Sequence, residues 1–150
     1  MSERYLKPGW FTGNVFNRAV SGLTRAGLSL RGSRVLAVRG RRSGQWRTTP
    51  VNLLDHEGHR YLVAPRGTTE WVRNLRAAGG GELRLGRRAE PFSATEVPNS
   101  EKAPLLRAYL RRWAMETGAF FGGVKADAAD DELSRIAGDH PIFEIDSRTR

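Results

Sequence analysis

Residues 34–54 read RVLAVRGRRSGQWRTTPVNLL and decide the fold of this chain. Apolar and β-branched residues alternate on both sides of a turn, which predicts strands over 34–39 and 48–54. The turn is too short for a parallel crossover, so the two strands are expected to pair antiparallel. This part of the chain is therefore predicted to be a β-hairpin.

The tip of that hairpin has the composition of an anion site. Arg41, Arg42 and Arg47 place three guanidinium groups beside two glycines and Ser43. Glycine brings backbone N–H groups close to a ligand, serine adds a hydroxyl donor, and arginine presents a planar fork that matches phosphoryl or carboxylate oxygens. The alternative is a solvated hairpin, because short motifs of this kind also occur by chance.

The remaining pattern completes a small α+β barrel. Its expected elements are strands over 60–64, 82–85, 90–97 and 142–145 and helices over 69–78, from Asn99 or Ser100 to Trp113, and over 127–137. Gly79, Gly80 and Gly81 are predicted to end the first of these helices, and 115–125 is predicted to be a loop. Short connections favour six mainly antiparallel strands with peripheral helices over a doubly wound sheet.

Charge is distributed unevenly along the 150 residues. Residues 1–54 hold ten Lys or Arg and one acid, whereas residues 55–150 hold fifteen of each sign, so the first third carries the whole net charge of +9. Such a field attracts polyanions: nucleic acid, an anionic membrane surface or a multiply charged cofactor. The absence of cysteine excludes disulfides and thiol catalysis.

The N-terminal part is predicted to be a separate element. Residues 10–26 have the apolar spacing of an amphipathic helix, so we divide the chain into an N-terminal helix, 1–30, and one barrel domain, 31–150. The apolar stripe fits either the barrel core or an anionic membrane surface. No stretch approaches the about 18 apolar residues of a transmembrane helix. We expect a cytoplasmic protein, with peripheral contact at the inner membrane face as an option.

Metal sites and nucleophiles are poorly supported. His56 and His59 flank a loop glycine without a third ligand at usable spacing, and the acids of 127–132 lack the pattern of a calcium loop. Ser43 has no nearby base in the sequence. We therefore predict no metal and assign no catalytic side chain.

A second informative segment spans residues 61–75. A strand ends at Ala64, a glycine turn carries Arg66 and Gly67, and a helix with Trp71 follows. A helix that begins at a sheet edge presents free backbone donors and a positive dipole end. Trp71 is expected either to wall an aromatic ligand or to join the core.

Together these motifs resemble a known family. The pattern Gly40-Arg-x-Ser-Gly-x-x-Arg-x-x-Pro50, followed by Val63-Ala-x-x-Gly67 and Trp71-x-x-Asn74-Leu75, is similar to the actinobacterial deazaflavin-dependent nitroreductases, which use coenzyme F420. The resemblance covers roughly residues 5–146. It implies a split β-barrel related to flavin-binding pyridoxamine phosphate oxidases. It also implies hydride transfer from the reduced deazaflavin to a quinone or nitroaromatic acceptor.

The resemblance also implies site residues. The phosphate and poly-glutamate tail of the coenzyme would be held by Arg41, Arg42, Ser43, Gly44 and Arg47, with Thr48 at the edge. The deazaflavin ring would lie against Ala64, Arg66, Gly67 and Trp71. Phe120 and Phe121 stand where characterised nitroreductases place tyrosines, which leaves the acceptor and the proton donor open.

Two other functions fit part of the sequence. One is a split-barrel oxidoreductase that binds flavin mononucleotide. The other is a basic nucleic-acid-binding barrel, although Trp46 is the only aromatic residue in 28–54 and stacking residues are therefore not interleaved with the basic ones. The sequence does not specify the oligomeric state.

Overall fold

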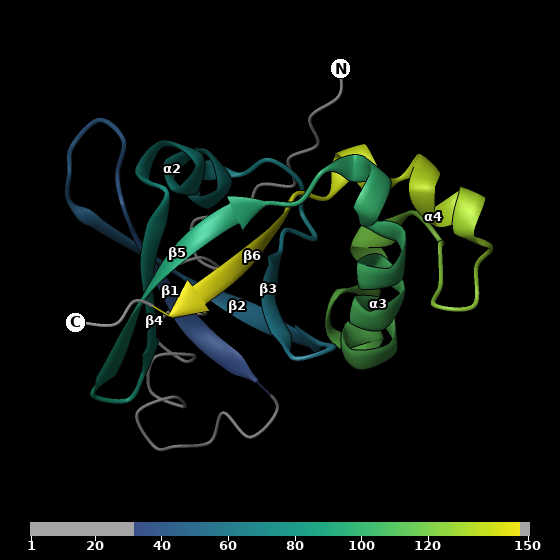
Figure 1. Cartoon of the computed structure of the whole chain (residues 1–150), viewed down its shortest axis with the longest axis horizontal. Helices are drawn as coiled ribbons and strands as arrows, with labels where there is room; N and C mark the ends of the chain where they lie inside the picture. The colour runs from purple at the N-terminus through teal and green to yellow at the C-terminus, as the bar shows by residue number, and fades with distance from the viewer. Residues whose placement is uncertain (1–31, 148–150) are drawn as a thin grey trace.

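The computed structural model describes residues 32–147. They form a closed barrel in which every neighbouring pair of strands is antiparallel, in the order β1-β2-β3-β6-β5-β4 (Figure 1). The predicted barrel class is confirmed. The helix predicted over 10–26 and the boundary at residue 30 lie outside the described residues. The strands are β1 (Ser33–Arg39), β2 (Trp46–His56), β3 (His59–Val63), β4 (Gly80–Leu85), β5 (Arg88–Glu96) and β6 (Ile142–Ser147).

The barrel interior holds one hydrophobic core, and helix α2 (Glu70–Ala78) covers one end of it. Alternate residues of the strands point inward, among them Leu36, Leu62 and Phe92, which are fully buried. Val72 and Leu75 of α2 pack into the same cluster. Figure 1 shows α2 beside the hairpin formed by β1 and β2. The predicted helix is therefore held against the barrel by its buried apolar side chains.

A second core joins the outside of the barrel to helix α3 (Ala103–Thr117). Tyr61 and Leu54 contribute to it from the strands, and Trp113 is buried there at 1% exposure. The Trp113 indole donates a hydrogen bond to the Leu53 carbonyl at 2.8 Å. Because a buried indole N–H needs an acceptor, this bond fixes α3 against β2.

Glycines let β4 pair closely with both of its neighbours, which corrects one prediction. Gly79 ends α2 in the left-handed conformation, as predicted, with φ +75°. Gly80 and Gly81 instead begin β4. A Cβ on Gly81 would lie 2.5 Å from the Ala37 carbonyl oxygen, and one on Gly80 would clash with the Phe92 carbonyl. All three glycines were predicted to end the helix, whereas Gly80 and Gly81 allow the close packing of β4 against its neighbours.

The last third differs from the prediction at its ends. Asn99–Glu101 form a short 3-10 turn, η1, and no side chain caps α3, so the predicted Asn99 or Ser100 cap is wrong. Helix α3 then runs into the predicted loop and is followed by η2 (Gly118–Phe121). The helix predicted over 127–137 is α4 (Asp130–Arg135), with acids in its first turn as expected, followed by η3 (Ala137–Asp139).

Lys102, the N-cap residue of α3, links this helix to η3 through its side chain. Its side chain is buried at 2% exposure, and Nζ donates to the Ala137 carbonyl at 2.9 Å. Desolvation lowers the pKa of Lys102, against a smaller opposite effect from Glu96. Residues far apart in the sequence are thus held together by one buried ammonium group.

Gly81→Ala should destabilise the barrel. The new methyl group would overlap backbone, which cannot rotate away, so we expect a loss of roughly 1–3 kcal/mol in the free energy of unfolding. Urea denaturation measures it. Gly118→Ala is the control, because its Cβ would lie 3.8 Å from Ala114 Cβ at an ordinary φ of −57°. Equal effects of the two substitutions would contradict the close approach.

Lys102→Met should change how stability depends on pH. The folded-state pKa lies below 10.5, so between the two values the unfolded chain still binds a proton that the folded chain has released. Wild-type stability should therefore rise relative to the methionine variant as pH increases toward 10.5. The gain is about 1.4 kcal/mol for each unit by which the pKa is lowered. A pH-independent difference in urea denaturation would refute the assignment.

Candidate functional site

The turn between β1 and β2 is closed by its own backbone. Gly40 N–H donates to the Gln45 carbonyl at 2.8 Å, and Gly44 N–H donates to the Gly40 carbonyl at 2.9 Å. Gly44 has φ +72°, and a Cβ on Gly40 would lie 2.8 Å from Ser43 Oγ. Gly44 is therefore favoured by its left-handed conformation, a side chain on Gly40 would displace the Ser43 hydroxyl, and the turn has a defined shape without a ligand.

Ser43 takes part in this closure but keeps donor capacity. Its Oγ accepts a hydrogen bond from the Gln45 N–H at 3.2 Å, and the residue is exposed. A hydroxyl that accepts one bond still has its own proton to donate. Ser43 is thus positioned as an outward donor at the tip of the turn.

The second predicted segment forms a tight turn followed by the start of α2. Gly67 N–H donates to the Ala64 carbonyl at 3.2 Å, and Gly67 has φ +89°. Thr69 is the N-cap residue of α2, but its side chain makes no capping bond. Its Oγ1 is buried and finds no hydrogen-bond partner within residues 32–147. The first-turn N–H groups of α2 are also without helical acceptors, as at any helix start.

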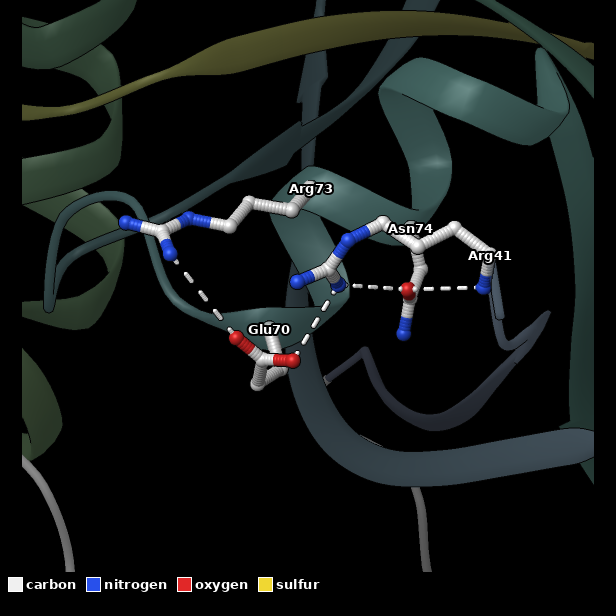
Figure 2. Close-up of polar contacts among 4 residues, drawn as sticks. All are labelled: Arg41, Glu70, Arg73 and Asn74. Carbon is white, nitrogen blue, oxygen red and sulfur yellow. Dashed lines mark hydrogen bonds and ion pairs between the residues drawn. The ribbon is translucent and has the colours of Figure 1, made fainter. Parts of the chain in front are cut away.

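Asn74 joins these two segments. Its Oδ1 accepts a hydrogen bond from the backbone N–H of Arg41 at 3.1 Å and another from Arg41 Nη1 at 2.8 Å (Figure 2). Asn74 is buried at 5% exposure, so an unmade bond there would be costly. The structure therefore brings the arginine turn and the start of α2 into one site.

Glu70 makes the other contact of the Arg41 guanidinium. Its Oε1 lies 3.1 Å from Arg41 Nη1, and its Oε2 lies 4.0 Å from Arg73 Nη1 (Figure 2). The hydrogen bond from Arg41 is the main cause that lowers the pKa of Glu70, with smaller contributions from the charges of Arg73 and Arg42. Glu70 is accordingly ionised at neutral pH.

Arg42 and Arg47 remain available for a ligand. Both are exposed, and neither has an ion-pair or hydrogen-bond partner within the part of the chain that the structure describes. The Arg47 side chain passes close to Gly40, since its Nε would lie 3.6 Å from a Cβ there. The three predicted arginines are thus not equivalent: Arg41 is tied to α2, whereas Arg42 and Arg47 point their charge outward.

Only some of the residues predicted to surround the deazaflavin ring lie close together. Trp71 is half-buried, with its ring 6.2 Å from that of Phe143. The Arg66 guanidinium lies 5.8 Å from the ring centre of Phe120, which brings η2 to the Ala64–Gly67 turn. Thr48 is exposed on β2, opposite Ala37 in the strand register. Trp71 therefore serves the core with part of its surface and leaves another part accessible.

A cavity of about 520 Å³ lies elsewhere, between the end of α3 and the 123–127 loop. None of its lining residues was predicted for the site; they are Leu110, Ala114, Gly118, Gly123, Val124, Lys125, Ala126 and Asp127. We locate the candidate site by its donors instead, because a charged tail is recognised by hydrogen bonds and charge at a surface.

Residues 32–147 contain neither a metal-binding cluster nor a membrane-spanning helix. Within residues 32–147 no cluster of three His, Asp or Glu side chains is placed to bind a metal ion. His59 instead pairs with Glu144 at 2.8 Å. The described helices include none of sufficient length and apolarity to cross a bilayer.

Sequence comparison identifies the family. The profile of the F420H2-dependent quinone reductases matches residues 13–118, which contain every predicted site residue. The chain belongs to the F420H2-dependent quinone reductase family. It is therefore an oxidoreductase that uses coenzyme F420, as the motif resemblance predicted. Comparison with curated proteins gives no significant match.

Solved structures similar to this family member agree on the split-barrel fold. One, described as a domain-swapped dimer, has 17% identity and a TM-score of 0.55, with 89% of this chain and 95% of that chain covered. An F420-H2 dependent reductase has 16% identity and a TM-score of 0.55, with coverage of 77% and 95%. An FAD-binding protein of Mesorhizobium loti has 15% identity and a TM-score of 0.51, with coverage of 81% and 85%.

The donors of this family member fit the anionic end of its coenzyme. Coenzyme F420 carries a phosphodiester and a poly-glutamate tail, which need cationic and N–H or O–H donors. The site offers two outward guanidinium groups, the Ser43 hydroxyl, the first-turn amides of α2 and the buried Thr69 hydroxyl, which has no partner among residues 32–147. The chemistry of these groups matches phosphate and carboxylate oxygens.

The sequence analysis gave no site role to three residues that lie here: Thr69, Glu70 and Asn74. Asn74 belonged to the quoted motif, and its spacing of three from Trp71 was the available signal. Glu70 had a signal too, since it is the only acid between Arg60 and Glu82. Neither signal reveals which arginine the side chain contacts, because that pairing joins positions about thirty apart in the chain.

Asn74→Ala should loosen the site and lower stability. The substitution leaves the Arg41 N–H without its buried acceptor, so we expect a loss of about 1–3 kcal/mol in the free energy of unfolding. Asn74→Asp keeps an acceptor for both Arg41 donors and should retain more stability than alanine. Urea denaturation compares the three proteins, and equal stability of the alanine variant and wild type would refute the role of this contact.

Proposed function

We propose that the β1–β2 turn and the start of α2 bind the phosphate and glutamate end of coenzyme F420. The observation that carries this proposal is the double hydrogen bond from Arg41 to Asn74, which holds the two donor-bearing segments side by side. Arg42 and Arg47 supply the ionic contacts, and Ser43 and the Gly44 backbone supply neutral donors. Thr48 lies at the edge of this region, on the same strand as Arg47.

The ring end of the coenzyme lies on the other side of α2 in this proposal. Arg66 lines it from the tight turn, whose shape is set by the positive φ of Gly67. Ala64, at 1% exposure, and Gly67 are themselves buried, so they contribute by shaping that turn. The exposed part of Trp71 packs beside the ring. The bound reduced coenzyme supplies the hydride equivalent, so the protein's own work is to orient the two reactants and exclude water.

We further infer that the acceptor is a quinone rather than a nitroaromatic compound. The family name supports a quinone. Phe120 and Phe121 lack the hydroxyl that would donate a proton to a nitro group. Phe121 is buried at 1% exposure and stacks on His140, so only Phe120, half-buried under Arg66, is placed to contact an acceptor. An apolar wall suits a planar, weakly polar acceptor.

We also propose that residues 10–26 contact an anionic membrane surface. This contact suits a quinone acceptor, because such acceptors partition into lipid. Sedimentation of the full chain and of a truncation beginning at Arg31 with anionic vesicles tests it. Equal pelleting of both would dismiss a role for the N-terminal segment.

The double substitution Arg42→Ala and Arg47→Ala should weaken coenzyme binding. Each lost charged hydrogen bond is worth about 1.5–3 kcal/mol, which corresponds to about tenfold or more in the dissociation constant. Fluorescence titration with oxidised coenzyme F420 measures the effect.

The matched control removes two exposed arginines at the β4–β5 hairpin tip, Arg87→Ala in the turn and Arg88→Ala at the start of β5, with the same change in net charge. Equal weakening by both double substitutions would mean that only the overall charge matters. Tighter binding of flavin mononucleotide than of coenzyme F420 by wild type would overturn the proposed cofactor.

A further inference from the structure

The Arg41 guanidinium contacts two acceptors of very different character. Asn74 Oδ1 is buried and receives two hydrogen bonds from the same residue. Glu70 is a carboxylate whose side chain is 66% exposed, and its Oε1 accepts a hydrogen bond from Arg41 Nη1, the same nitrogen that bonds Asn74 Oδ1 (Figure 2). Burial makes the first contact costly to break, whereas water and salt screen the second. The first contact is structural and the second is exchangeable.

Arg73 offers Glu70 a second cation. Its Nη1 lies 4.0 Å from Glu70 Oε2, one helical turn along α2. The two oxygens of one carboxylate are therefore shared between two arginines, and rotation of the Glu70 side chain away from Arg41 leaves it paired with Arg73 alone. Such a rotation needs no backbone movement, because exposed i, i+3 pairs form and break by rotamer change.

We propose that Glu70 is an intramolecular stand-in for the coenzyme's anionic end. Glu70 contacts both Arg41 and Arg73 in the free protein. It releases Arg41 and keeps Arg73 when a phosphate or glutamate oxygen of the coenzyme binds Arg41, and it pairs with Arg41 again when the coenzyme leaves. This inference rests on the proposed function of the site. It extends that function by naming the group that competes with the coenzyme.

The expected consequence is easier coenzyme exchange. An oxidoreductase of this kind must release the oxidised coenzyme before it binds the reduced form. A carboxylate that recaptures Arg41 lowers the affinity by the strength of the ion pair that must be broken. The direction of the Glu70 pKa shift supports this reading, because the carboxylate is charged and ready to compete at neutral pH.

Glu70→Gln tests the proposal. Loss of the competing charge should tighten binding of oxidised coenzyme F420 about two- to fivefold, the strength of an exposed ion pair, with slower dissociation after dilution. The matched control is Glu82→Gln, which removes the same charge from a Glu–Arg pair of the same 3.1 Å length on β4. Thermal denaturation checks that both variants fold like wild type.

Arg73→Gln provides the second measurement. If Arg73 receives Glu70, its loss should weaken coenzyme binding about two- to fivefold when Glu70 is present and have little effect in the Glu70→Gln background. Equal weakening in both backgrounds would show that Arg73 acts directly on the coenzyme and would overturn the exchange. Equal affinities of the Glu70→Gln and Glu82→Gln variants would overturn the stand-in role.

The controls separate this inference from the proposed function. If wild type binds coenzyme F420 and the Arg42 and Arg47 substitutions weaken binding, the site stands, and only the Glu70 outcome decides the stand-in. If wild type does not bind the coenzyme, the proposed function fails and the stand-in role fails with it.

Discussion

The side-chain amide of Asn74 is the contact on which the site depends. Its oxygen accepts hydrogen bonds from both the backbone N–H and the guanidinium group of Arg41, so the β1–β2 turn is held in place against α2. Helix α2 is in turn anchored through Val72 and Leu75 in the barrel core. A charged surface loop thereby acquires the rigidity of the interior. Preorganised donors bind an anion with a smaller entropic cost than donors on a mobile loop.

The hydrogen bonds between Arg41 and Asn74 also explain why the arginines of the turn have different roles. Arg41 comes from the most basic part of the sequence, yet its role in the described structure is to satisfy Asn74 and Glu70. Arg42 and Arg47 flank it and carry the outward charge. Net charge alone therefore does not show which cations a ligand can reach at once. Arg42 and Arg47 have no side-chain acceptor within residues 32–147, whereas Arg41 must first release Glu70.

The sequence predicted the barrel well because its evidence was local. Alternation marked each strand, and Gly44, Gly67 and Gly79 marked turns that do adopt positive φ. It failed where the cause was a distant neighbour. Gly80 and Gly81 were read as a helix stop, although the carbonyls of Phe92 and Ala37 exclude a side chain there. The predicted cap at Asn99 or Ser100 failed because these residues form the η1 turn and α3 begins after Lys102, whose side chain reaches η3 across 35 residues.

The difference between local patterns and distant contacts also explains why the sequence predicted the coenzyme but not the role of Glu70 as its competitor. Cofactor recognition is encoded in short spacings such as Gly40 to Pro50, which a reader can match to a family. The Glu70 contact depends on where a nine-residue helix sits against a hairpin tip, and only the folded barrel sets that. An enzyme whose hydride chemistry belongs to its coenzyme needs few reactive side chains. The remaining requirements of such a site are to bind and release the coenzyme, and these are the steps in which the proposal places Glu70 and Arg73.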